Sequence, residues 1–577
     1  MDNTNATSDE GSYIPRENLR GPLGGESVTH SGDTEVSSSI TLDSAIYSSE
    51  IPGENALLVT GGDVTVNDPV ITKTGDSTSE NADFYGTNAA VLATDGTLNI
   101  NTGAITTNGA YANGLFAYGS GKIIVKNTLI TTNLRNSGGI MVAGGGEITA
   151  ANLTVTTTGD SSAAIRSDRG GGVINVEGGS YKTEGAGSPA VYSTAEIHVK
   201  DGASLVSTAS EGVVIEGSNQ VYLEKSTLED TNNTLHGNSE TYKNIFIYQS
   251  MSGDAEEGTG TFSANNSKIT TNKGDTFFIT NTTAEIDLEN NLFVNNDSSS
   301  AFLHAAVGKW GTQGNNGGNV KLSFTDQVAE GDIIVDSLST VNFYLSDESF
   351  YKGTINGNDG GENVSVTIDE DSTIVLTGNS YINELKNADK ENMNIYSNGY
   401  ALYVNGTEVA VNGEKAPEVP EIVLDLSEST DGAILVIEPN NECTGSFFNL
   451  KCMDTKQLIP FIVGGISILV LLIILIAAII MRSKKNKKNS EEPEPQISQD
   501  NPFRDTVTPV SIEETEEIKE VEVVSTPESA PEPDDSSDEP SSKMPTPPEY
   551  NEPVDTSSPT EESKTDEPKS DTPDFLK

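Results

Sequence analysis

A repeat with a period near 25 residues runs through the first part of the chain. Seven segments between residues 53 and 233 can be aligned on one apolar position each, and these positions are spaced by 34, 25, 25, 26, 23 and 24 residues. The aligned residues are Val64, Leu98, Ile123, Ile148, Ile174, Ile197 and Val221. A nearly fixed period of this length indicates stacked units, each of which buries its apolar row against the next unit.

Within each repeat, short runs of alternating apolar and polar residues are separated by Gly, Asn and Asp, without a sustained helical period. Examples are TLNI at 97–100, IIVKN at 123–127 and TVTTT at 154–158. Two or three short strands in a turn of about 25 residues, joined where Gly or Asn takes a positive φ, predict an all-β parallel β-helix. A leucine-rich repeat has a similar period, but its LxxLxLxxN signature is absent from the sequence.

The predicted solenoid spans residues 44–413, with an end-cap near 370–413, and follows a poorly ordered N-terminal extension at 1–43. The repeat loosens after Asn233, although KITTNKGDTFFIT and TAEIDLENNLFVNN still fit single coils. About fifteen coils at a strand spacing of ~4.8 Å make a rod roughly 70 Å long. Such a rod would display a surface far from its anchor.

A resemblance to a known group rests on GTNAAVLATDGTLNINTGAITTNG, which forms one coil at 86–109. Residues 86–232 resemble the adhesin-like, right-handed parallel β-helix surface proteins of bacteria and their autotransporter passengers. The segments STIVLTGNSYINELKN and NIYSNGYALYVNG are similar to the end-cap of that group, and GGVI and FVNN to motifs of polymorphic membrane proteins. The resemblance covers about two-thirds of the chain and implies attachment or surface display more than catalysis.

The run Phe461–Met481 predicts one transmembrane helix. It has no charged residue, and at 1.5 Å per residue it spans about 31 Å, the thickness of a bilayer's hydrocarbon core. By the positive-inside rule, the basic cluster after it places the C-terminal tail in the cytoplasm and the N-terminal domain outside the plasma membrane. That cluster, which we expect to bind anionic lipid, consists of Arg482, Lys484, Lys485, Lys487 and Lys488.

The flanks of the span leave alternatives open. The first residues have neither a basic n-region nor an apolar h-region, so either the natural start lies upstream or the single span directs its own insertion. In the predicted juxtamembrane stalk, residues 414–460, we expect Cys443 and Cys452 to form a disulfide outside the cell. Two free thiols are the alternative.

The predicted cytoplasmic tail, residues 482–577, is acidic and rich in proline, and we expect it to be disordered. It contains a PPxY motif, formed by Pro547, Pro548 and Tyr550, and an NPF motif, formed by Asn501, Pro502 and Phe503. The first is the kind of ligand that a WW domain binds, and the second resembles the ligands of EH-domain endocytic adaptors. A bacterial-type solenoid joined to such a tail indicates a parasitic or commensal unicellular eukaryote.

The sequence also contains candidate modification sites. Eight N-x-[ST] sequons lie on the outer side of the span, at Asn5, Asn152, Asn232, Asn265, Asn281, Asn296, Asn363 and Asn405. They suggest a glycoprotein, but an Asn- and Thr-rich sequence also produces sequons by chance. Gly464 and Gly465 weaken the outer third of the span and mark a possible intramembrane cleavage region; the alternative is that glycine is simply common in transmembrane helices.

Composition and motifs argue against an enzyme and against nucleic-acid binding. A formal charge of -54 would repel a phosphate backbone. The four histidines lack ligand spacing, so no metal or cofactor is predicted, and the polygalacturonase-type signatures NTD, GHG and RIK are absent. In AAIRSDRGGG, Arg166 and Arg169 are expected to be solvated turn residues rather than a catalytic base.

Two surface features have alternative explanations. Threonines recur in ITTN at 105–108, in ITTN at 130–133 and in TVTTT at 154–158. Stacked threonines can form a flat ice-binding or glycan-binding face, but we favour the ordinary preference of Thr for exposed strands. Trp310 lies in a Gly-rich segment, AAVGKWGTQGNNGG, and is either a sugar-stacking platform or a loop anchor.

These features together predict a single-pass cell-surface adhesin or surface-display protein. It would attach to a protein or glycan ligand on host cells or matrix, while its tail recruits WW-domain and EH-domain trafficking adaptors. One alternative is a carbohydrate-binding or carbohydrate-cleaving β-helix. The other is an endocytic receptor whose ligand uptake depends on Phe503 and Tyr550.

Overall fold

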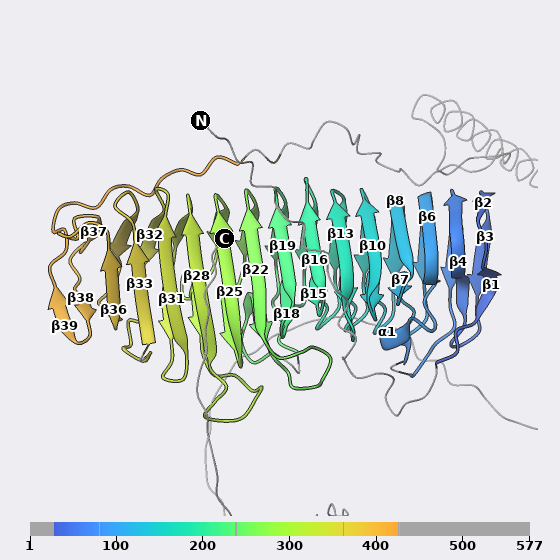
Figure 1. Cartoon of the computed structure of the whole chain (residues 1–577), viewed down its shortest axis with the longest axis horizontal. Coiled ribbons are helices and arrows are strands. Elements are labelled where there is room, and N and C mark those ends of the chain that lie inside the picture. Colours follow the sequence, from blue (N-terminus) through green and yellow to red (C-terminus); the bar gives the residue numbers. More distant parts are fainter. Residues whose placement is uncertain (1–27, 80, 237–238, 362, 425, 427–577) are drawn as a thin grey trace, which may run out of the picture. The chain divides into compact units, whose positions relative to one another are not determined.

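The structure is a computed structural model and describes residues 28–79, 81–236, 239–361, 363–424 and 426. Over these residues the chain winds into a parallel β-solenoid of the right-handed type with about 15 turns (Figure 1). The predicted all-β solenoid is therefore confirmed. Helix is almost absent from the described part of the chain, where α1 (Asn81–Tyr85) is a single turn.

Most turns contain three strands, which form three faces that we call A, B and C; strands of one face pair in parallel with those one turn away. Three long strands run across corners between faces: β4 (Asn55–Asn67), β6 (Val91–Thr107) and β8 (Lys122–Thr132). Face A otherwise contains β2 (Ile40–Asp43), β10 (Gly146–Ala151), β13 (Gly172–Glu177), β16 (Glu196–Lys200), β19 (Gln220–Glu224), β22 (Thr259–Asn265), β25 (Thr282–Glu289), β28 (Gly318–Thr325), β31 (Thr340–Ser346), β33 (Asn363–Ile368) and β36 (Glu384–Asn387).

Face B contains β3 (Ile46–Ser49), β5 (Val70–Lys73), β11 (Thr154–Thr157), β14 (Ser180–Thr183), β17 (Ser204–Ser207), β20 (Thr227–Asp230), β23 (Lys268–Thr271), β26 (Leu292–Asn295), β29 (Val328–Glu330), β32 (Phe350–Gly353), β34 (Thr373–Leu376) and β37 (Ile395–Tyr396). Face C contains β1 (Gly32–Val36), β7 (Leu115–Tyr118), β9 (Ile140–Ala143), β12 (Ile165–Ser167), β15 (Val191–Ser193), β18 (Val213–Glu216), β21 (Lys243–Tyr248), β24 (Asp275–Thr280), β27 (Leu303–Ala305), β30 (Ile333–Val335), β35 (Ser380–Ile382), β38 (Leu402–Val404) and β39 (Thr407–Val409).

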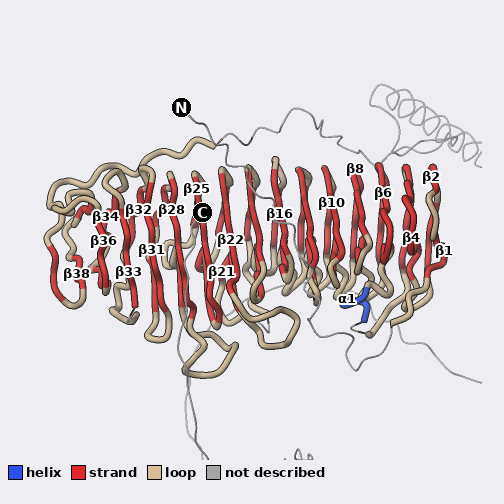
Figure 2. The backbone as a smooth tube through the Cα atoms, viewed as in Figure 1, coloured by secondary structure: helices blue, strands red, loops and turns tan. Residues whose placement is uncertain are grey.

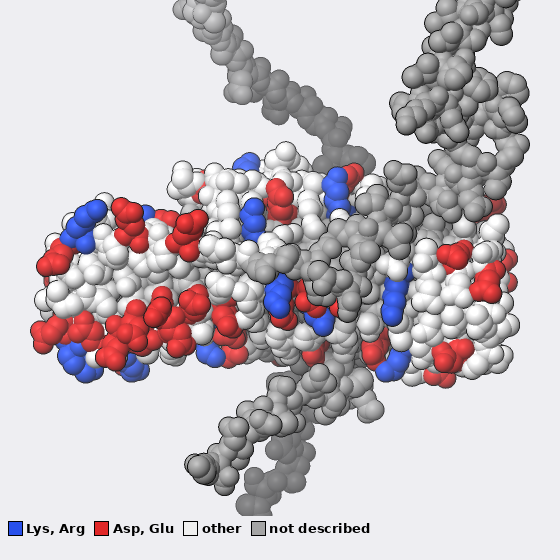
Figure 3. Space-filling model, turned by 90° about the horizontal axis from the view of Figure 1, so that it is seen from above, with Lys and Arg blue, Asp and Glu red and all other residues white. Residues whose placement is uncertain are grey.

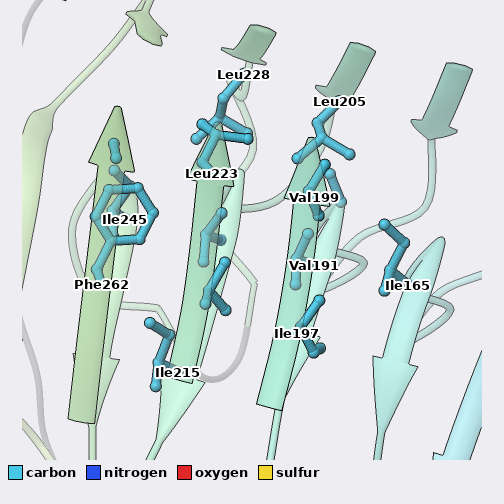
Figure 4. Close-up of a cluster of buried hydrophobic side chains, with 14 of the residues drawn as sticks. Ile165, Val191, Ile197, Val199, Leu205, Ile215, Leu223, Leu228, Ile245 and Phe262 are labelled. Atoms are coloured by element: carbon cyan, nitrogen blue, oxygen red, sulfur yellow. The ribbon is translucent and has the colours of Figure 1, made fainter. Parts of the chain in front are cut away.

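The apolar row that defines the repeat lies inside the solenoid on face A. All seven aligned residues, from Val64 to Val221, pair with one another in successive turns and are at most 1% exposed. Side chains from faces B and C meet those of face A in the interior, as Leu205 lies beside Val199 and Val191 beside Ile197 (Figure 4). Burial of each such side chain contributes about 1.5–3 kcal/mol, so the stack of rows forms the core.

The repeat is interrupted after Asn233 by insertions, but its register continues. Val221 pairs with Phe262 one turn later, although the coils are offset by 41 residues there, and a later turn has an offset of 36 residues. The same inward row continues as Phe262, Ile286, Leu322, Phe343, Val366 and Leu385. The apparent loosening in the sequence therefore reflects extra loop residues between strands that still stack.

The corner between faces A and B is made by one residue in the left-handed conformation in most turns. Asn127, Asn152, Asn266 and Asn290 have φ values of 50°, 52°, 50° and 47°. Asn adopts this conformation more readily than most non-glycine residues. Adjacent corner amides also bond to one another, with Asn290 Nδ2 donating to Asn266 Oδ1 at 2.6 Å. The predicted role of Asn in the turns is confirmed here.

The first coil begins upstream of the predicted boundary at residue 44. Strands β1 and β2 already pair with β4, and Ile40 takes the place that Val64 takes one turn later. These strands, GDTEV and ITLD, are short and largely polar, so they show no apolar row to align. At the other end, β38 and β39 form an antiparallel hairpin within the predicted end-cap. Its turn uses positive φ at Asn405 and Gly406, as a two-residue hairpin requires.

The threonine-rich strands do not form a broad threonine face. In the first ITTN segment, Ile105 and Thr107 are buried in the interior, and of the two threonines only Thr106 points outward. The outward column contains one threonine per turn, at Thr72, Thr106, Thr131 and Thr156, before Lys182 replaces it. A single short column agrees with the preference of Thr for exposed strands.

The inward threonines belong to a buried polar column on face B that includes an acid. The column runs through Thr107, Thr132, Thr157, Thr183, Ser207, Asp230 and Thr271. Asp230 Oδ1 accepts a hydrogen bond from the backbone N–H of Asn232 at 2.6 Å, whereas its buried Oδ2 has no partner among the residues that the structure describes. Burial raises the pKa of Asp230 to about 8, so the side chain is largely neutral at pH 7 in the folded protein.

The substitution Asp230→Asn tests this burial. The folded protein keeps the Asp230 proton up to about pH 8, whereas an unfolded aspartate loses it near pH ~3.9, so this group lowers wild-type stability progressively between those two values. Asparagine cannot ionise. The melting temperature of the variant relative to wild type should therefore rise from pH 4 to pH 8, measured by circular dichroism. Asp326→Asn, at an exposed corner, serves as the control, and parallel pH profiles for Asp230→Asn and wild type would refute the raised pKa.

Candidate functional site

Face C is apolar on its outer surface as well as its inner one. An outward-pointing row passes from turn to turn through Leu58, Leu92, Phe116, Met141, Arg166, Tyr192, Val214, Phe246, Phe278 and His304. Strands β21 and β24 are accordingly buried almost throughout. Such continuous burial is typical of strands covered on both faces, so a second layer lies over face C.

Insertions at the corners of face C form this second layer. They are the α1 segment (81–90), which precedes β6; the 250 loop (249–258), which follows β21; and the Trp310 loop (306–317), which follows β27. The α1 segment lies where a face C strand begins and the other two loops lie where face C strands end, and all three appear along the lower edge of the solenoid as drawn in Figures 1 and 2. Because loops on a rigid scaffold are where binding sites concentrate, this edge is the candidate functional surface.

The α1 segment closes tightly over the first part of the outer row. Leu92 and Phe116 lie under Gly86, whose left-handed backbone approaches them so closely that a side chain at this position would clash. Asn55 Nδ2 donates to the carbonyls of Gly86 and Ala89 at 2.8 and 2.9 Å, which fixes the segment on β4. This part of face C is a sealed structural layer.

Arg166 is a buried ion-pair residue, so the prediction of a solvated turn is wrong. It lies on β12 with its side chain 13% exposed, 3.0 Å from Asp83 of α1 and 3.1 Å from Asp168. Burial raises the pKa of Asp168 to about 7, although the charge of Arg166 acts in the opposite direction. The Asp83 partner is 83 residues away in the chain, so the AAIRSDRGGG segment alone gave no sign of the pair.

Arg169 is also engaged rather than solvated. Its Nε lies 2.5 Å from Asp254 of the 250 loop, and its guanidinium carbon lies 3.9 Å from the centre of the Phe84 ring. A cation over an aromatic face is attracted by the ring quadrupole. Arg166 and Arg169 therefore fasten the α1 segment and the 250 loop to face C.

Glu216, at the end of β18, is a second point of attachment for the 250 loop. It accepts hydrogen bonds from the hydroxyls of Tyr192 at 2.6 Å and Tyr248 at 3.2 Å, and from that of Ser250. Burial holds the pKa of both tyrosine hydroxyls well above the usual range. They consequently remain donors to the carboxylate at physiological pH.

A buried charge cluster joins the segment before β21 to the solenoid. Glu211 lies 3.1 Å from His236 and 3.5 Å from Lys243, and it accepts a hydrogen bond from Ser239 at 2.5 Å. Burial alone would raise the pKa of Glu211, but these partners outweigh it and hold the pKa well below its ordinary value. Burial lowers the pKa of Lys243 in spite of the nearby Glu211 charge.

A recess of about 210 Å³ opens beside the Trp310 loop. Phe246, Phe278 and His304, from the adjacent strands β21, β24 and β27, contribute to its walls together with Trp310. His304 Nδ1 is hydrogen-bonded to Asp275 Oδ2 at 2.9 Å, and this bond orients the imidazole. The recess thus combines aromatic rings with an oriented polar group.

Trp310 serves as a loop anchor, which was one of its two predicted roles. Its ring packs 5.7 Å from the ring of Tyr248, centre to centre. Asn316 Nδ2 donates to the carbonyls of Gly308 and Trp310 at 2.8 and 2.9 Å. The ring also lines the recess, so its use as a sugar platform stays a prediction.

The next residues of the same loop line a second recess, of about 530 Å³. Its walls are mostly amides, hydroxyls and glycines, including Gln249, Asn281, Thr282, Thr283, Thr312, Asn315 and Asn319. Glu257 is the acidic residue in this lining. The Trp310 loop therefore borders one aromatic and one amide-rich recess.

Histidine and acidic side chains do not gather into a metal centre in the described part of the chain. No group of three His, Cys, Asp or Glu residues within it could hold a metal ion. His198 instead stacks on Tyr222 at 4.5 Å, and His30 bonds to the carbonyl of Tyr85 at 2.8 Å. These contacts are structural.

The predicted glycosylation sites differ in accessibility. Asn296, Asn363 and Asn405 are exposed, Asn152, Asn265 and Asn281 are partly exposed, Asn232 is 2% exposed, and Asn5 lies outside the described residues. Asn281 lines the amide-rich recess, and its Nδ2 donates to the carbonyl of Gln249 at 2.6 Å. Whether these asparagines carry glycans stays a prediction.

Several predicted sites lie outside the described residues. They are Cys443, Cys452, the span 461–481 with Gly464 and Gly465, the basic cluster and both tail motifs. Among the residues that the structure describes, no helix has the length and hydropathy to cross a bilayer.

No protein-family model matches this chain, and neither a curated protein nor a solved structure matches it. Its function must be inferred from its own residues and geometry.

The substitution Arg166→Ala tests the attachment of the α1 segment. It leaves Asp83 and Asp168 buried without their cation, which typically costs about 3–5 kcal/mol. We expect a lower melting temperature and faster amide hydrogen exchange in residues 81–90. Lys122→Ala, which removes a partner of the exposed Lys122–Glu147 pair, should change stability by less than about 1 kcal/mol. If Arg166→Ala and Lys122→Ala changed the melting temperature and the hydrogen exchange of residues 81–90 equally, Arg166 would not hold the α1 segment on face C.

Proposed function

We propose that the protein is a cell-surface adhesin or surface-display protein whose solenoid presents a binding surface along face C. The observation that supports this function is the position of the insertions. The α1 segment, the 250 loop and the Trp310 loop interrupt an otherwise regular repeat, and all of them cover the same face. A stiff scaffold with fastened loops loses little conformational entropy when it binds.

The arrangement in the membrane is part of the proposal and rests on the sequence. Residues 461–481 span the plasma membrane, and the solenoid lies outside, where it meets a ligand on host cells or matrix. The tail, residues 482–577, recruits WW-domain and EH-domain adaptors through its PPxY and NPF motifs. The source is a parasitic or commensal unicellular eukaryote.

Attachment to a host-cell monolayer tests the adhesin function. Cells that express the full-length protein should attach more than cells that express a version without residues 44–440 at equal surface level. A version in which residues 307–316 are replaced by a short Gly-Ser linker should lose much of the gain, because the loop leaves face C. Asp326→Asn with Asp347→Asn, at a corner away from face C, should retain it. Equal attachment with and without the solenoid would reject adhesion and favour an endocytic receptor.

The tail motif gives a separate prediction. If a WW-domain protein binds the PPxY motif and promotes removal from the surface, Tyr550→Ala should lengthen the surface half-life, since the tyrosine is an essential part of that ligand. Surface labelling followed over time measures this. If the surface half-life of the variant equals that of wild type, the PPxY motif does not control removal of the protein from the surface.

A further inference from the structure

We propose that the two recesses beside the Trp310 loop bind a neutral oligosaccharide. This inference rests on the proposed binding function and names its ligand class. Sugars present both apolar C–H faces and hydroxyl edges. A site for them therefore needs an aromatic surface together with amide and hydroxyl groups, and the two parts of this loop border those two kinds of surface.

The first recess has the size and polarity of a site for one sugar residue. Its volume of about 210 Å³ lies below the range of about 300–1,000 Å³ that is usual for drug-sized ligands. Phe278 and Trp310 supply aromatic surface, and the partly exposed His304 lies at the edge. Within the described part of the chain, His304 Nε2 makes no hydrogen bond, while Nδ1 is held by Asp275. This nitrogen is therefore available to a ligand hydroxyl.

The charges around the first recess disfavour a cationic ligand. Aromatic recesses often bind ammonium groups, but here an ammonium group of the protein already lies over one face of each of three aromatic rings. Lys243 Nζ lies 4.6 Å from the centre of the Phe246 ring and 5.4 Å from that of Phe278, and Lys309 Nζ lies 4.8 Å from that of Trp310. A bound cation would be repelled by both lysines.

The same charges give an anionic ligand little advantage. Lys243 is paired with Glu211 at 3.5 Å, and His304 with Asp275 at 2.9 Å, while Glu240 adds a negative charge to the lining. An anion would have to compete with these carboxylates inside a chain of net charge -54. A neutral ligand avoids both penalties.

The second recess supplies groups that bind sugar hydroxyls. Asn281, Asn315 and Thr312 contribute amides and a hydroxyl, which can both donate and accept hydrogen bonds. Gly308–Trp310 line the first recess and Gly311, Thr312 and Asn315 the second, so the two sites share one loop. An oligosaccharide can place one residue on the aromatic side of the loop and another on the amide side.

The test uses the full-length protein, produced in a bacterial host that attaches no N-linked glycans and purified in detergent, so that no glycan on Asn281 fills the second recess. The probe is an array of immobilised oligosaccharides with neutral, N-acetylated and carboxylated residues. We expect binding to a subset of neutral oligosaccharides. Trp310→Ala and Asn315→Ala should each weaken it by about tenfold or more. Tyr400→Ala, which removes an exposed aromatic ring in the end-cap, should leave it unchanged.

Trp310→Ala could also release the loop, so a second variant keeps the test decisive. Val307 is exposed and lines the first recess. Val307→Arg fills that recess and leaves the Trp310 anchor in place, so it should abolish binding without lowering the melting temperature. Binding that survives Val307→Arg, binding only to carboxylated glycans, or no binding to any neutral oligosaccharide at micromolar protein would each overturn the proposal.

The outcome also separates this inference from the proposed function. If host-cell attachment requires the solenoid but no oligosaccharide on the array is bound, the adhesin function is supported and its ligand is a protein. If the protein binds oligosaccharides on the array, Val307→Arg abolishes this binding and the solenoid gives no host-cell attachment, the saccharide site is supported and the adhesin function is rejected.

Discussion

The structure depends on keeping each coil in register with the next. Parallel strands of one face can stack only if inward residues meet inward residues, and a slip of one residue would turn every side chain to the opposite side. The row from Val64 to Leu385 satisfies this requirement even where the coil offset grows to 36 or 41 residues. Insertions therefore occur only at the corners between faces. Sequence differences between coils that could serve a function are confined to these corners.

The corners meet this constraint in different ways. The corner between faces A and B turns through one or two left-handed residues in most turns. Towards the C-terminal end, it carries Asp326, Asp347, Glu348, Asp369, Glu370, Asp371 and Asp389, and acidic side chains form a row over this end of the solenoid (Figure 3). The corners of face C instead carry the insertions, which convert an outer strand surface into a second interior. Arg166, Glu211 and Glu216 became buried for that reason, and each is paired because an unpaired buried charge would be costly.

The sequence predicted what the repeat itself determines. The spacing near 25 residues, the inward row and the Asn-rich turns follow from local pattern, and the structure confirms them. The outer row of face C was not predicted, although the unbroken apolar runs IFIY and FFI of β21 and β24 and the offset of 41 residues were its signals. The role of Arg166 depends on Asp83, which only the folded path of the α1 segment brings within 3.0 Å. Contacts of that kind cannot be read from a single coil.

The three insertions differ in how completely they close over face C, and this difference locates the binding site. The α1 segment packs two aromatic residues, Phe84 and Tyr85, close to the outer row and leaves its apolar side chains sealed. The Trp310 loop has one aromatic anchor and several glycines, among them Gly311 and Gly314 in the left-handed region. Glycines have no side chains to fill space, so this loop stands over Phe246, Phe278 and His304 without completing the layer. A bound ligand would complete it, which is why we place recognition at the Trp310 loop rather than at α1.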